Sequence, residues 1–102
     1  MIRKEFIENE IKLDPENPMN YYLLALEFRK LGNFLEFESA LESLINRFNN
    51  YLPTYYIYAE YLFSNNQNEK AEEIIKKGID LAFVTENTKM IKELKQLNEI
   101  NS

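Results

Sequence analysis

The sequence predicts an all-α fold of about six helices arranged as antiparallel pairs. Apolar residues recur at i, i+3, i+4 and i+7, which is the spacing of one face of a helix. The stretches between these helices contain Gly, Asn or Pro, which end or begin helices. No segment alternates apolar and polar residues between turn signals, so we expect no strands.

A spacing of 34 residues relates two parts of the chain, residues 18–51 and 52–85. It places Tyr21 on Tyr55 and Gly32 on Asn66. Gly and Asn are the two residue types that most readily adopt a left-handed conformation after a helix. Apolar positions coincide as well, in the pairs Ala25 and Ala59, Phe28 and Leu62, Leu41 and Ile75, and Ile45 and Ile79. Each 34-residue unit is therefore predicted to be one pair of helices.

A short helix is predicted before the first pair, over residues 2–13. Its residues Ile7 and Ile11 lie 34 positions before Leu41 and Ile45, so it matches the second helix of a pair. The next helix starts at Asn17-Pro18, because Pro is favoured in the first turn, and it ends at Gly32. Its predicted inward stripe is Tyr21, Leu24, Ala25 and Phe28.

The remaining elements follow the same plan. Asn33 is predicted to cap a helix whose stripe is Phe34, Phe37, Leu41, Leu44, Ile45 and Phe48. The second pair starts at Pro53 and breaks at Asn65-Asn66, and its stripes are Tyr55, Tyr58, Ala59 and Leu62, then Ala71, Ile74, Ile75, Gly78, Ile79 and Ala82. A last helix over residues 86–100 carries Met90, Leu94 and Leu97 on one face.

Length and composition restrict the class of protein. The 102 residues, 45% hydrophobic and 28% charged, are typical of one globular domain. A net charge of −5 without a basic stripe argues against a nucleic-acid partner. No apolar run is long enough for a membrane span, and the first residues lack the core of a signal peptide. We therefore expect a cytoplasmic protein that binds neither membrane nor nucleic acid.

The residues needed for common catalytic sites are absent. The chain has no His and no Cys, which removes an imidazole base, a thiolate nucleophile and an ordinary zinc site. The two Gly residues leave no Gly-rich phosphate loop. Carboxylates such as Glu69, Glu72 and Glu73 stand beside lysines on predicted polar faces, where solvated ion pairs are the ordinary explanation. We expect no enzyme, no cofactor and no metal ion.

The repeated residues resemble the tetratricopeptide repeat family. The motif positions are Tyr21, Leu24, Ala25, Phe28 and Gly32 in the first unit, and Tyr55, Tyr58, Ala59, Leu62, Ala71 and Gly78 in the second. The stretch "LDPENP" is similar to a junction between such repeats. The resemblance covers nearly the whole chain as one domain and is greatest to short stand-alone bacterial members. It implies an α-solenoid with residues 86–100 as the capping helix. Phe37 departs from the small residue that the family prefers there.

This resemblance implies a protein-binding groove lined by a second stripe on the first helix of each pair. The candidate groove residues are Tyr22, Leu23, Leu26, Arg29 and Lys30 in the first pair, and Tyr56, Ile57, Glu60 and Phe63 in the second. Their aromatic and aliphatic character predicts an apolar peptide or helix of another protein as the ligand.

Three alternatives remain for the same stripe. It could bury itself in a homodimer, or pack against the rest of its own chain. The opening "YYIYAEY" also resembles the half-a-TPR repeats of RNA-processing scaffolds, although Leu62 stands where that family has a Glu.

Overall fold

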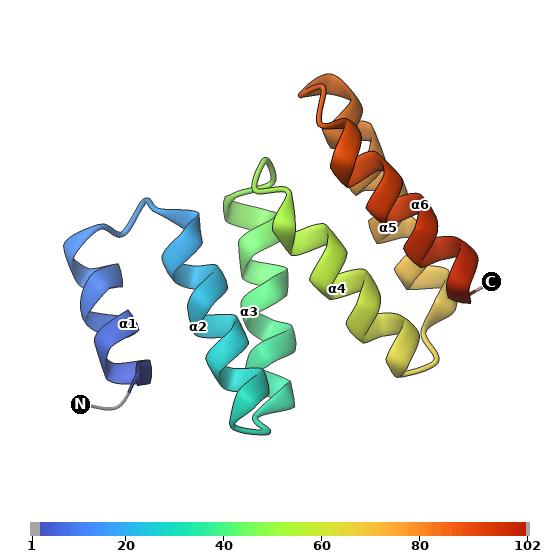
Figure 1. Ribbon diagram of the computed structural model, residues 1–102. Helices are drawn as coiled ribbons and strands as arrows, with labels where there is room; N and C mark the ends of the chain where they lie inside the picture. The colour runs from blue at the N-terminus through green and yellow to red at the C-terminus, as the bar shows by residue number, and fades with distance from the viewer. Residues whose placement is uncertain (1–2, 102) are drawn as a thin grey trace. The chain divides into compact units, whose positions relative to one another are not determined.

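The computed structural model of the chain describes residues 3–101 and confirms the all-α fold (Figure 1). Over this range it contains six helices and no strand. Their bounds are α1 Arg3–Leu13, α2 Pro18–Lys30, α3 Phe34–Arg47, α4 Pro53–Ser64, α5 Asn68–Val84 and α6 Thr88–Asn101. Ile2, where the first helix was predicted to begin, lies outside the described residues.

The chain forms two compact units, the first reaching Tyr51 and the second starting at Leu52. This division falls at the same point as the junction between the two 34-residue repeats. In the first unit α1 packs on α2 and α2 packs on α3. In the second unit α5 packs on both α4 and α6, and α4 also contacts α6. Neighbouring helices in the sequence are thus packing partners within each unit.

Short-range signals set where α2 begins. The side chain of Asn17 accepts a hydrogen bond from the backbone N–H of Met19, at 3.1 Å, and Pro18 follows in the first turn. This satisfies one of the amide groups that a helix start leaves without a partner. Asn33 stands at the equivalent position before α3, but its side chain makes no capping hydrogen bond.

Three of the turns share one backbone geometry. Gly32, Asn66 and Glu86 adopt positive φ values of 79°, 61° and 58° after α2, α4 and α5. In each turn the next amide returns to a carbonyl five residues earlier, as Asn33 does to Phe28 at 2.8 Å and Gln67 to Leu62 at 2.9 Å. These bonds satisfy carbonyl groups that the helix end leaves open. The predicted equivalence of Gly32 and Asn66 is confirmed.

An ion pair joins α1 to α2 in the first unit. Arg3 Nε lies 2.9 Å from Glu27 Oε1, and the Glu27 side chain is only 9% exposed. Next to this pair, the Lys4 ammonium lies 5.7 Å from the ring centroid of Phe28. Together with the buried side chain of Ile7, these contacts hold α1 against α2.

Gly78 allows the helices of the second unit to approach closely. A Cβ atom on Gly78 would lie 2.9 Å from Cδ1 of Leu94 in α6 and 2.9 Å from Cβ of Tyr55 in α4. These distances are too short for a real side chain. The missing Cβ therefore sets the contact of α5 with both of its neighbours. Leu94 and Leu97 on α6 are buried in this unit.

None of the helices within residues 3–101 combines the length and the apolar character needed to cross a bilayer.

Candidate functional site

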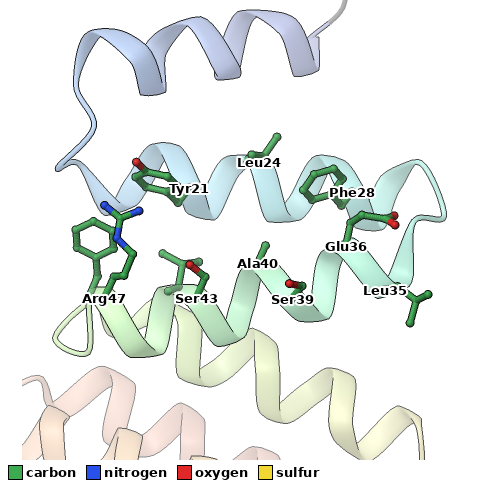
Figure 2. Close-up of a pocket in the computed structure, with 11 residues that line it drawn as sticks. Tyr21, Leu24, Phe28, Leu35, Glu36, Ser39, Ala40, Ser43 and Arg47 are labelled. Carbon is green, nitrogen blue, oxygen red and sulfur yellow. The ribbon is translucent and has the colours of Figure 1, made fainter.

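A groove lies between α2 and α3 in the first unit, and we refer to it as the α2–α3 groove (Figure 2). It encloses about 500 Å³, within the range of small ligand pockets. Most of its lining is apolar. The lining residues are Tyr21, Leu24 and Phe28 from α2, and Leu35, Glu36, Ser39, Ala40, Ser43, Leu44, Arg47 and Phe48 from α3 and its C-terminal end.

Small side chains on α3 keep the groove open. Ser39, Ala40 and Ser43 line it and carry at most one heavy atom beyond Cβ. The positions 34 residues later, on α5, carry longer side chains: Glu73, Ile74 and Lys77. Ile74 is itself buried there. The first helix pair therefore lacks side-chain volume that the second pair has.

The apolar stripe of the first helix differs in burial between the two pairs. Tyr55, Tyr58 and Leu62 on α4 are buried, with 5%, 0% and 0% of their surface exposed. Their counterparts on α2, which line the groove, are only half-buried: Tyr21, Leu24 and Phe28. Of the inward stripe predicted for α2, only Ala25 is completely buried. A stripe predicted to serve the core thus also provides accessible apolar surface.

Arg47 occupies one end of the groove. Its guanidinium lies 4.9 Å from the ring centroids of both Tyr21 and Phe48, and these rings lie 5.6 Å apart. The carbonyl oxygen of Pro15 accepts a hydrogen bond from the Tyr21 hydroxyl at 2.8 Å and a longer one from Arg47 Nη2 at 3.5 Å. Aromatic rings and one carbonyl thus hold the Arg47 side chain in place.

The other end of the groove carries Glu36, next to Phe28 (Figure 2). Exposed apolar residues continue beyond it at the α2–α3 turn. Leu31 and Phe34 are about half exposed, and Leu35 is 82% exposed. Apolar surface therefore extends from the groove onto the turn.

The candidate residues from the first pair lie on other faces of α2. Tyr22, Leu23 and Leu26 are half-buried, whereas Arg29 and Lys30 are exposed. The Tyr22 ring packs edge-on against Tyr51 with ring centroids 5.6 Å apart. The Arg29 guanidinium lies 5.5 Å from the ring of Phe37. None of these five residues lines the α2–α3 groove.

The candidate residues from the second pair are mostly covered. Ile57 and Phe63 are each 7% exposed, so they offer little surface to a partner. Tyr56 is half-buried, and Glu60 is exposed. The accessible members of this set on α4 are therefore Tyr56 and Glu60.

The α2–α3 groove was not predicted from the sequence. The available signal was the row of small residues, Ser39, Ala40 and Ser43, on a helix whose repeat partner carries larger ones. Neither Ser nor Ala stands out from composition or periodicity alone. Only a position-by-position comparison of side-chain volume between the two repeats would have revealed the groove.

Metal-ligand groups and shifted pKa values were compared over residues 3–101. No group of three or more His, Cys, Asp or Glu side chains in that range could hold a metal ion. Burial raises the pKa of the Tyr51 and Tyr55 phenols. Neither shift has a neighbouring charge as its cause, unlike the pairs that tune acid–base residues.

No protein-family model matches the chain, and neither a curated protein nor a solved structure matches it. The resemblance to tetratricopeptide repeats therefore depends on the residues and spacing of this chain alone.

Proposed function

We propose that the protein is an interaction module that binds an apolar helical or extended segment of another protein in the α2–α3 groove. The observation that carries this proposal is a groove of about 500 Å³ with a mostly apolar lining between two packed helices. Contiguous apolar surface on a monomer often marks an interaction site. The same proposal includes a tetratricopeptide-like stacking of the helix pairs and a cytoplasmic location.

The shape of the groove fits a helix or a peptide better than a small polar metabolite. Aromatic and aliphatic side chains line its length, and its two charged lining residues stand near the ends (Figure 2). Helix-in-groove recognition places apolar anchors at i, i+3 or i+4 and i+7 along such a surface. The aromatic residues and Arg47 are also of the types enriched at binding hot spots.

The test compares three forms of the chain as bait in affinity capture from cytosol of the source organism. Ala40→Arg places a long charged side chain in the groove. Asn46→Arg adds the same charge on α3 outside the groove lining and is the matched control. Binding of each captured protein is then measured with purified components. We expect Ala40→Arg to lose a partner that the parent and Asn46→Arg retain.

Two results would contradict the proposal. Equal binding by all three folded forms would remove the α2–α3 groove from consideration. Loss of binding only in a Tyr22→Ala, Tyr56→Ala double variant would place the partner on the residues predicted from the sequence. Circular dichroism and melting temperature must show that each variant is folded.

Self-association is a second candidate. The exposed apolar residues beyond the groove, Leu31, Phe34 and Leu35, favour it because such a surface can meet its own copy. Light scattering over a range of concentrations separates the two functions. A concentration-dependent dimer that Ala40→Arg converts to monomer would favour the homodimer.

A further inference from the structure

We propose that the α2–α3 groove selects an amphipathic helix with a carboxylate side chain at the end of its apolar face, and that Arg47 binds this carboxylate. The inference depends on the proposed function, because it names the chemistry of the partner at the same site. Charge complementarity between the two ends of the groove carries it. The positive group lies at the C-terminal end of α3, and the negative group lies near its N-terminal end.

Arg47 is positioned to receive a carboxylate. Its guanidinium contacts the rings of Tyr21 and Phe48 and reaches the Pro15 carbonyl only at 3.5 Å. No carboxylate from within residues 3–101 pairs with it, in contrast to Arg3, which is paired with Glu27 at 2.9 Å. A guanidinium presents five N–H donors in a planar fork, which matches the two oxygens of a carboxylate. The ring contacts limit its rotamers before a ligand arrives, which lowers the entropy lost on binding.

Glu36 determines the direction of the ligand. It lines the groove near Phe28, at the end opposite Arg47 (Figure 2). A carboxylate of the ligand placed there would meet a like charge, and the chain as a whole carries a net charge of −5. An acidic group therefore has one favourable position in the groove, and an inverted ligand is disfavoured.

The dimensions between these ends match about three turns of helix. Arg47 lies 11 positions after Glu36 on α3, a rise of about 16 Å. Apolar anchors at i, i+3 or i+4 and i+7 of a ligand helix would span the stretch lined by Phe28, Leu24 and Tyr21. Ala40 and Ser43 present short side chains opposite, so a ligand helix can approach α3 closely.

The experiment selects 16-residue helical peptides from a displayed random library on the full chain, with Ala40→Arg as counter-selection. The sequences of the selected peptides are compared position by position. The peptide that binds most tightly is synthesised in two forms, an acidic peptide with its shared Glu or Asp and an amide peptide with Gln or Asn at that position. Fluorescence anisotropy then measures both peptides on the parent, on Arg47→Gln, and on Lys76→Gln. The last variant removes one positive charge from an exposed position on α5.

We expect groove-dependent peptides to share an acidic position at one end of the apolar face. Arg47→Gln should weaken the acidic peptide about fivefold, the upper range for exposed ion pairs, and should leave the amide peptide within about twofold. Lys76→Gln should change neither. If Arg47→Gln fails to fold, Arg47→Met, which keeps an unbranched stem but carries no charge, gives the same comparison. The acidic peptide should also lose affinity with added salt while the amide peptide does not.

The remaining outcomes separate the two proposals. Groove-dependent peptides without a shared acidic position would overturn this inference and leave the proposed function standing. So would an Arg47→Gln variant that weakens both peptides equally, because Arg47 would then act through the shape of the groove. If Ala40→Arg removes no binding at all, the proposed function itself fails, and this inference fails with it. If light scattering shows a dimer in solution in which a second copy of the chain occupies the groove, the homodimer replaces the peptide ligand. That result would overturn this inference.

Discussion

The α carbon of Gly78 faces Tyr55 so closely that an added Cβ would lie 2.9 Å from the Cβ of Tyr55. Tyr55 Cβ is fixed to the backbone of α4, so relief would require movement of α4 relative to α5. Gly in the interior of a helix is otherwise about 1 kcal/mol less favourable than Ala. We expect this contact to outweigh the intrinsic helix preference of Ala over Gly.

The first prediction concerns this contact. Gly78→Ala should lower the free energy of unfolding by about 1 to 3 kcal/mol, as overpacking does elsewhere, despite the better helix propensity of Ala. Urea denaturation measures the change. Asp80→Ala, on the exposed side of the same helix, should stay within about 0.5 kcal/mol of the parent. A more stable Gly78→Ala variant would show that α4 and α5 separate without cost.

The second prediction tests the backbone at Gly32, which has φ 79° and has open space where a Cβ would lie. Gly32→Ala should destabilise the chain by about 1 kcal/mol through conformational strain, since no clash is involved. Gly32→Asn should cost less, because Asn66 adopts the same geometry in the second pair. Thermal unfolding of both variants provides the comparison. Equal losses for Ala and Asn would contradict the strain argument.

The third prediction separates stability from binding. Ala40→Leu adds apolar atoms to a groove that is open to solvent in the chain alone, so the free energy of unfolding should be unchanged or rise by up to about 1 kcal/mol. The same variant should bind a groove ligand less tightly because it occupies the space of that ligand. Calorimetric unfolding and peptide anisotropy on one preparation measure both effects. A clear loss of stability would mean that position 40 is already fully packed.

The fourth prediction concerns alkaline pH. Desolvation raises the pKa of the Tyr51 and Tyr55 phenols above their ordinary value of 10.0 in the folded chain. As pH rises past about 10, the unfolded chain therefore releases these protons before the folded chain does. The contribution to stability is complete below that pH and is lost progressively above it.

A Tyr51→Phe, Tyr55→Phe double variant isolates this effect, because lysines also lose protons near this pH. Between about pH 8 and about pH 11, its free energy of unfolding should fall less steeply than that of the parent. Urea denaturation at each pH is the measurement. Identical slopes would show that the two phenols titrate alike in the folded and unfolded chains.

Local signals predicted the helices well where a residue with a strong backbone preference stands at the helix boundary. Pro18 and Pro53 begin α2 and α4, and Gly32 and Asn66 follow the ends of α2 and α4 in left-handed conformations. The turn at Glu86 has the same geometry, but Glu is not a residue type that signals it. In that turn the Asn87 amide donates a hydrogen bond to the Ala82 carbonyl at 2.8 Å, as in the other two turns. The residue type at position 86 therefore did not signal the turn.

The groove could not be predicted in the same way, because it depends on volumes compared across two helices. Leu24 and Phe28 satisfy the same apolar pattern as Tyr58 and Leu62, yet their exposure differs. Periodicity reports which residues share a face, but it does not report how completely that face is covered. The pairing of Arg47 with two rings likewise requires the three-dimensional positions of Tyr21 and Phe48.

The depth of the groove originates in the absence of side-chain atoms at Ser39, Ala40 and Ser43. A single-nucleotide change such as Ala40→Val would narrow it without disturbing a cap, a turn or a buried contact between helices. Under the proposed function, such a change during evolution would alter the choice of partner while the architecture is kept. The side-chain volume at position 40 would therefore tune binding, while the residues that begin and end the helices stay unchanged.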